Sequence, residues 1–180
     1  EVIASENALE VTRRDDSKTD GKTLGNLSIT GGTFTGEIYI EADEGQETSS
    51  AQLTISGGTF LDVRGSGYDV SQYLSSGMTQ DENGKIIVDP VTAEAKIGDV
   101  NYVTLTAALN DAVSGETVIL LKDEVELEEE IPVGVILEVS SGQSLKIATE
   151  KLATLIGSEG KIRVNAGATL DVGGTKMIGG

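Results

Sequence analysis

The sequence predicts an all-β protein, a parallel β-helix (a solenoid of stacked coils) with a short amphipathic capping helix. Two pairs of internal repeats, alternating apolar and polar residues within each repeat, and glycine-containing turns predict this fold. The 180 residues include 23 Gly but only 2 Pro, which does not fit collagen. Hydrophobic residues make up 38% of the chain and aromatic residues only 3%. We therefore expect a core of Val, Ile, Leu and Ala.

The repeats predict strands that lie on successive coils. Leu27–Phe34 matches Leu53–Phe60 at a sequence offset of 26, and Val139–Ile147 matches Val164–Val172 at an offset of 25. Each unit alternates inward apolar and outward polar residues and contains glycine at a turn. One such unit cannot bury its apolar face, but stacking at a fixed period closes that face. The alternative is an antiparallel sandwich of hairpins, which also produces alternating strands.

A helix is expected over residues 104–113, because apolar residues recur there at helical spacing. Thr104 is the expected N-cap and Gly115 the expected residue after the helix. A buried strand is expected directly afterwards, over 117–121. The apolar positions of the helix are Leu105, Ala108, Leu109, Ala112 and Val113.

The order of these features predicts two modules. Residues 1–90 are expected to hold the C-terminal coils and closing strand of one β-helix module. A short helical turn is expected near Asp69 or Ser71, and a turn over 81–85 before the closing strand. Residues 93–180 are expected to begin a second module, with strand 95–97, the capping helix and new coils. Both chain ends fall inside patterned sequence, so we expect a segment of a larger protein.

Composition excludes several functions. The net charge of −17 argues against nucleic acid and anionic membranes as partners, since both require clustered Lys and Arg. The chain has no Cys and no His, which removes the thiolate nucleophile, the commonest general base and the commonest transition-metal ligand. No apolar run approaches the ~20 residues that span a bilayer. We accordingly predict no catalytic residues, no cofactor-binding residues and no metal ligands.

Residues 102–120 resemble the N-terminal cap of right-handed parallel β-helices of the pectin-methylesterase type. In that family an aromatic residue precedes an amphipathic helix, a Gly-Asp/Glu-Thr turn and the first strand. The resemblance implies a right-handed helix whose capping helix covers the edge of the first coil. It does not extend to the catalytic coils, because residues 122–127 depart from the family pattern. The matching residues are Tyr102, Leu105, Ala108, Leu109, Ala112, Gly115, Glu116, Thr117, Val118 and Leu120.

Most of residues 53–130 resemble a second group, the GGTF-repeat surface or adhesin-like proteins of anaerobic bacteria. The matching motifs occur in order as Ile55–Phe60, Asp69–Gly77, Gly84–Val88 and Ala95–Asp99. This resemblance implies a secreted or cell-surface location and a structural or adhesive role.

Three groups of residues are candidate sites. The acidic run Asp123–Glu130 is either a weak Ca²⁺ site or the solvated face of a strand in which Val125, Leu127, Ile131 and Val133 point inward. Residues 13–16 (Arg-Arg-Asp-Asp) and 20–21 (Asp-Gly) are either a cation site or catalytic pair, or a polar loop. The four tyrosines, Tyr39, Tyr68, Tyr73 and Tyr102, either stack on sugars or lie at core edges and caps.

We therefore expect a non-catalytic structural or adhesive module outside the cell, with an unknown host or microbial protein or glycan as ligand. The alternative is a glycan-binding or glycan-active domain of pectinase-like architecture, in which paired carboxylates converge in a groove. A third hypothesis is a cation-dependent scaffold.

Overall fold

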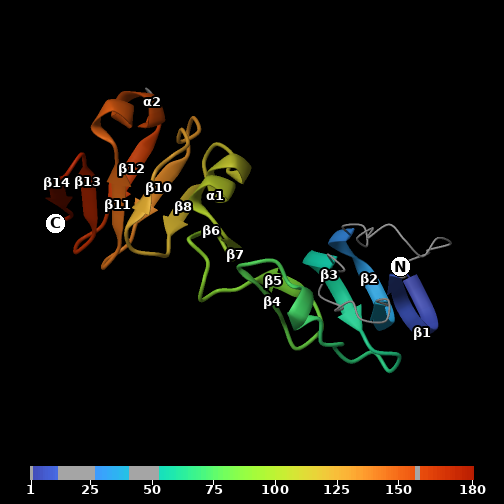
Figure 1. The fold of residues 1–180 in the computed structure, drawn as a ribbon. Helices are drawn as coiled ribbons and strands as arrows, with labels where there is room; N and C mark the ends of the chain where they lie inside the picture. The colour runs from blue at the N-terminus through green and yellow to red at the C-terminus, as the bar shows by residue number, and fades with distance from the viewer. Residues whose placement is uncertain (1, 12–26, 41–52, 157–158) are drawn as a thin grey trace, which may run out of the picture. The chain divides into compact units, whose positions relative to one another are not determined.

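The structure is a computed structural model that describes residues 2–11, 27–40, 53–156 and 159–180 (Figure 1). Strands account for 47% of the chain and helices for 12%, so the predicted β-rich class is confirmed at that level. The packing divides the chain into two compact units, Glu1–Ile87 and Val88–Gly180. None of the described helices is both long enough and apolar enough to span a bilayer.

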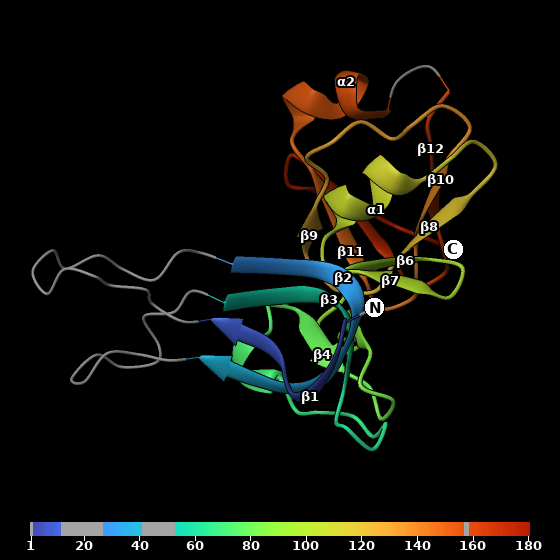
Figure 2. The ribbon, with the colours of Figure 1, turned by 90° about the vertical axis from the view of Figure 1, so that its right-hand side faces the viewer.

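The first unit contains a three-stranded sheet in the order β1-β2-β3, with β1 at Val2–Val11, β2 at Leu27–Ile40 and β3 at Leu53–Leu61 (Figure 2). All its strands are parallel. Leu27 lies opposite Leu53 and Phe34 opposite Phe60, so the two repeats occupy equivalent positions on neighbouring strands. The prediction of parallel, adjacent repeats is confirmed. A hairpin would instead have paired them antiparallel.

The two phenylalanines form a stacked pair within this unit. Their ring centroids lie 4.9 Å apart and the rings are inclined by only 5°. Phe60 is 1% exposed, whereas Phe34 is half-buried. The preceding glycines, Gly32 and Gly58, share positive φ values of 102° and 104°, which residues with a Cβ rarely adopt. Glycine two residues before each phenylalanine therefore lets strands β2 and β3 approach Phe34 and Phe60 with the same backbone geometry.

The rest of the first unit closes over β3. The expected helical turn is the 3₁₀ helix η2, at Ser71–Tyr73. Leu74 makes a parallel bridge to Ile55, and the next N–H, of Ser75, donates to the Ile55 oxygen at 2.8 Å. Two short strands, β4 at Met78–Gln80 and β5 at Ile86–Val88, form a separate sheet joined by the predicted turn over 81–85.

The second unit contains two sheets. The five-stranded sheet has the order β12-β10-β8-β6-β7, and the four-stranded sheet has the order β14-β13-β11-β9. The first comprises β6 Ala95–Ile97, β7 Val100–Tyr102, β8 Thr117–Leu120, β10 Ile136–Val139 and β12 Lys161–Val164. The second comprises β9 Val125–Glu126, β11 Ser144–Ile147, β13 Thr169–Val172 and β14 Thr175–Ile178.

From β8 to β13 the chain visits the two sheets alternately. In one sheet Ile136 of β10 pairs with Thr117 of β8 on one side and with Lys161 of β12 on the other. In the other sheet Leu145 of β11 pairs in the same way with Val125 of β9 and with Leu170 of β13. All four pairings are parallel. Because Leu145 and Leu170 are equivalent positions of the second pair of repeats, the predicted offset between those repeats is confirmed.

The core of the second unit is aliphatic. On each parallel strand alternate residues point inward, and burial of each large side chain contributes about 1.5–3 kcal/mol. The fully buried residues of strands β8, β10 and β11 are Val118, Leu120, Leu137, Val139, Leu145 and Ile147.

Helix α1 spans Leu105–Asp111 and is shorter than the predicted range of 104–113. Thr104 is the N-cap, as predicted, because its side chain accepts a hydrogen bond from the Ala107 N–H. At the other end the chain leaves the helix at Ala112, and Val113 is 62% exposed rather than buried. The Val113 N–H is bonded to the Glu116 carboxylate, so a local turn replaces the last expected helical turn.

Two further expectations are corrected. The hydrogen-bonding edge of β8 is occupied by β6, which pairs antiparallel with it, and not by the capping helix. The helix does pack Leu105, Ala108 and Leu109 into the same core as Val118 and Leu120 of β8. The sheets of this unit are mixed rather than purely parallel, since β6–β7 and β13–β14 are antiparallel hairpins. A second helix, α2 at Leu152–Ile156, follows the 3₁₀ turn η3 at Thr149–Lys151 and was not predicted; its five residues are too few to produce a helical pattern.

The stacked pair predicts unequal costs for two equivalent truncations. Phe60→Ala should lower the free energy of unfolding of the first unit by about 3–5 kcal/mol, because an enclosed ring leaves a cavity. Phe34→Ala should cost clearly less, because part of its ring is already in solvent. Urea denaturation followed by the amide signals of β3 measures both, and equal costs would contradict the enclosure of Phe60.

Candidate functional site

The described part of the second unit contains an acidic groove beside helix α1. The groove has a volume of about 520 Å³ and lies between the start of α1 and the segment that connects β8 to β9. Five of its residues are acidic and one is basic. Its lining residues are Glu94, Thr104, Leu105, Thr106, Lys122, Asp123, Glu124, Val125, Glu126 and Glu128.

Glu94 is held at the groove by the backbone of the helix. Its Oε2 accepts a hydrogen bond from the Leu105 N–H at 3.0 Å, while the Thr104 hydroxyl accepts one from the Ala107 N–H at 3.1 Å. Both bonds satisfy N–H groups that the first turn of a helix leaves without intrahelical partners. The Glu94 carboxylate is therefore committed to helix capping.

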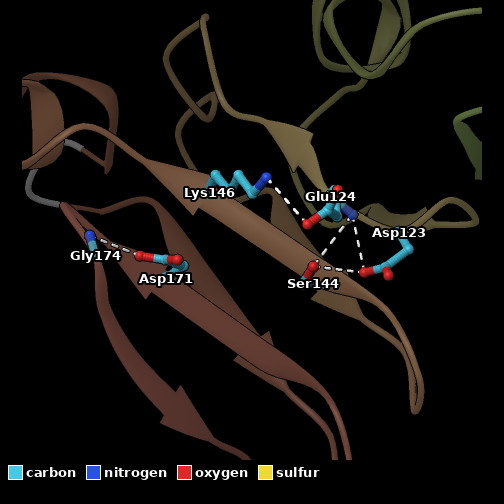
Figure 3. A network of polar contacts seen from close by, with 6 residues as sticks. All are labelled: Asp123, Glu124, Ser144, Lys146, Asp171 and Gly174. Atoms are coloured by element: carbon cyan, nitrogen blue, oxygen red, sulfur yellow. Dashed lines mark hydrogen bonds and ion pairs between the residues drawn. The ribbon is translucent and has the colours of Figure 1, made fainter.

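The far side of the groove is fixed by the polar network drawn in Figure 3. The Ser144 hydroxyl, on β11, donates to Asp123, and the Glu124 N–H donates to both Asp123 (2.9 Å) and Ser144 (3.1 Å). The Ser144 hydroxyl, followed by the Glu124 N–H, holds the pKa of the Asp123 carboxyl below its ordinary value. Asp123 thus remains ionised and anchors the β8–β9 segment to β11.

Glu124 has the one positive φ, 57°, among the described residues other than glycine. Its carboxylate lies 3.3 Å from the Lys146 ammonium; the Glu124 side chain is largely solvent-exposed and that of Lys146 partly so. An exposed ion pair of this kind contributes at most about 1 kcal/mol. The left-handed turn therefore aims Glu124 back across β11, but the network around it is a surface network rather than a buried reactive centre.

The acidic run of 123–130 is largely a solvated face. Leu127 and Ile131 are buried, as predicted, and Glu126 and Glu128 are exposed. The predicted strand is wrong in extent, because it covers only Val125–Glu126 and Val133 is 62% exposed. The chain turns after Leu127, and the Ile131 N–H donates to the Leu155 oxygen instead of continuing a ladder.

Within the described ranges, no three or more carboxylates come together in a way that could hold a metal ion. Residues 13–16 and 20–21 lie outside the described residues. The side chain of Tyr39 does as well. Tyr68 and Tyr73 pack at the edge of the first unit's core and Tyr102 at the edge of the second, as the core-edge interpretation predicts.

A second network crosses the five-stranded sheet. Glu138, on β10, accepts hydrogen bonds from the Asn165 amide and the Arg163 guanidinium, both at 2.9 Å. These two partners, the amide first, keep the pKa of the Glu138 carboxyl below its ordinary value. Sequence reasoning missed this network. The available signal was the separation of Glu138 and Arg163 along the chain, which equals the offset of the second repeat pair.

The groove presents its carboxylates as hydrogen-bond acceptors. Its best-defined carboxylates already accept hydrogen bonds, and a lowered pKa such as that of Asp123 is the opposite of what a general acid at neutral pH requires. The Ser144 hydroxyl donates to a carboxylate in an exposed position, where no developing charge is shielded from water.

The Asp123 network predicts a pH effect with a defined sign. Because the folded-state pKa is lowered, the contact stabilises the protein above the ordinary carboxyl pKa and is lost as the pH falls through the folded-state value. Ser144→Ala removes the largest cause and should raise the Asp123 pKa, so the loss begins at higher pH. Carboxyl ¹³C NMR titration measures the Asp123 pKa, and Ser141→Ala is the control variant. An unchanged Asp123 pKa in Ser144→Ala would contradict the assignment.

No protein-family model matches the chain, and neither a curated protein nor a solved structure matches it at a significant level. The function must therefore be inferred from the chain's own residues. Among the described residues, the acidic groove and the outward faces of the sheets offer the polar groups that a ligand would meet.

Proposed function

We propose that the chain is a non-catalytic β-solenoid module of a bacterial protein that is secreted or displayed at the cell surface, with a structural or adhesive role. In this proposal the solenoid is a right-handed parallel β-helix, and its exposed coil faces and loops meet a protein or glycan of a host or of another microbe.

The observation that carries the proposal is the in-register parallel stacking in the second unit. Strands β8, β10 and β12 pair without a shift, and so do β9, β11 and β13. A chain that visits two sheets alternately and returns beside its previous pass generates coils, each of which buries its apolar face against its neighbours. The parallel pairing of β2 and β3 supports the same interpretation of the first unit.

The surface supports a display role. The outward residues of the two sheets are mainly charged or hydroxylic, and the whole chain carries a net charge of −17. Such a surface keeps a module soluble and discourages self-association. The extracellular location rests on the resemblance of residues 53–130 to GGTF-repeat surface proteins.

A second candidate is a glycan-binding or glycan-active domain, because the groove at α1 gathers five carboxylates and Lys122. Catalysis by paired carboxylates requires one of them to be protonated at the working pH, which means a raised pKa. The pKa of the Asp123 carboxyl in the groove is instead lowered, first by the Ser144 hydroxyl. Glycan binding without turnover is therefore the form of this candidate that agrees with the site.

Deletion of one coil tests the solenoid. Removal of residues 136–160 brings the β12 sequence to the place of β10, beside β8, with every inward residue in phase. We expect a folded protein of lower stability and smaller urea m-value, because solenoid stability is approximately a sum over coils. NMR amide dispersion and urea denaturation give the result.

The matched control is a smaller deletion, of residues 136–143, which removes β10 but leaves β11. It places a strand of the second sheet beside β8 and breaks the alternation between the sheets. We expect this variant to unfold although it loses fewer residues. If the small deletion folds and the complete coil deletion does not, the solenoid proposal is wrong.

The non-catalytic role predicts binding without turnover. The purified chain, incubated with polygalacturonate and its methyl ester, should release neither reducing ends nor methanol. The fluorescently labelled chain should bind to intact epithelial or bacterial cells in a saturable manner. Turnover that Glu126→Gln abolishes would establish the glycan-active alternative, and absence of saturable binding would contradict the adhesive role.

A further inference from the structure

Strand β12 forms an edge of the five-stranded sheet, and its outer side has no partner strand among the residues that the structure describes. Its inward residues, Ile162 and Val164, are only half-buried, whereas Leu137 and Val139, which pair with them from β10, are fully buried. The apolar ladder is therefore closed on the β10 side of β12 and partly open on the other.

The backbone of β12 also presents unpaired groups. The Asn165 N–H donates to the Val139 oxygen at 3.1 Å, so this residue faces β10. Along a parallel strand the N–H and C=O groups of successive residues alternate between the two sides. The groups of Ile162 consequently point to the outer edge. This open stretch ends at Val164, against whose carbonyl oxygen Gly179 is packed so closely that a Cβ on Gly179 would lie 2.7 Å from it.

The outward residues of β12 are both basic and exposed. They are Lys161 and Arg163, and Arg163 pairs with Glu138 of β10 at 2.9 Å. The other sheet shows how this protein continues such a rung: acidic and basic residues alternate from strand to strand. The residues of that rung, from β9 to β14, are Glu126, Lys146, Asp171 and Lys176. On the outer side of β12, next to Arg163, an acidic residue would continue the same alternation of charges.

A second copy of the chain does not fit this edge. If two β12 strands pair antiparallel with their apolar residues on one face, Lys161 lies opposite Arg163 of the copy, or Arg163 lies opposite itself. Parallel pairing of two copies at the same register places each basic residue opposite its own counterpart. Like charges directly opposite each other destabilise a pair of strands, and inward or edge lysines are a known protection against such pairing.

We propose that the outer edge of β12 is a docking site for an extended segment of a partner protein in which apolar residues alternate with Asp or Glu. The apolar residues of the segment would pack beside Ile162, and its acidic residues would pair with Lys161 and Arg163. The backbone of the segment would form hydrogen bonds with the N–H and C=O groups of Ile162. This is strand addition to a sheet edge, in which the backbone supplies affinity and alternate side chains supply specificity. The inference rests on the strand order and charges of β12 and does not depend on a cell-surface role.

A blocked synthetic peptide in which valine alternates with glutamate tests the site on the full ¹⁵N-labelled chain. The peptide should shift the amide signals of Ile162 and Arg163 and slow hydrogen exchange at Ile162. In the double variant Lys161→Glu/Arg163→Glu, affinity should fall about tenfold or more, because two favourable cross-strand pairs become unfavourable. A peptide with lysine in place of glutamate should then be preferred at the same amides.

Two further variants separate the site from general effects. Lys161→Glu alone leaves the Glu138–Arg163 pair in place and should weaken the glutamate peptide by a smaller factor. Lys85→Glu removes an exposed lysine from the first unit and should change nothing at β12. Equal shifts of β12 by both peptides, no shift of β12 by either, or concentration-dependent dimerisation that Arg163→Glu abolishes would each overturn the proposal.

Discussion

The structure of the second unit depends on one constraint: a strand with apolar residues at every second position must have that face covered. No single pass of the chain achieves this, because each parallel strand has only four residues or fewer. In-register stacking solves the problem, since Val118, Leu137 and Ile162 then form one aliphatic ladder. A slip of one residue would turn every inward side chain outward. The register is therefore enforced by the core along its whole length.

The same constraint explains the antiparallel hairpins. A parallel stack leaves an open edge at each end, with unpaired backbone groups and a partly exposed apolar rung. At β8 the hairpin β6–β7 closes this edge, and Ala95, opposite Leu120, is fully buried there. At β13 the strand β14 closes the second sheet. The mixed sheets are thus compatible with a stacked architecture, in which antiparallel pairs are confined to the ends of parallel stacks.

The parallel repeats, the helix cap at Thr104 and the turn over 81–85 could be predicted from sequence, because each depends on local chemistry or on a repeated pattern. The helix end could not, because the hydrogen bond from the Val113 N–H to the Glu116 carboxylate forms a turn that overrides the helical spacing of Val113. The groove was found only in part: Asp123–Glu128 stood out by charge, whereas Ser144 and Glu94 are distant in sequence and ordinary in type. Long-range polar contacts leave no periodic signal unless, as for Glu138 and Arg163, their separation equals the repeat.

The outward polar contacts have a role that the core cannot perform. The aliphatic residues that neighbouring strands contribute to the core are similar in size. A pass of the chain that paired one strand too far along would therefore lose little hydrophobic burial. The outward polar groups differ from pass to pass. Asp123 with Ser144 links the first pass to the second, and Glu138 with Arg163 and Asn165 links the second to the third. A misplaced pass of the chain would leave these groups without partners or opposite like charges. In a chain with repeated strands the core supplies the stability, and these exposed, individually weak contacts favour the correct order of the passes.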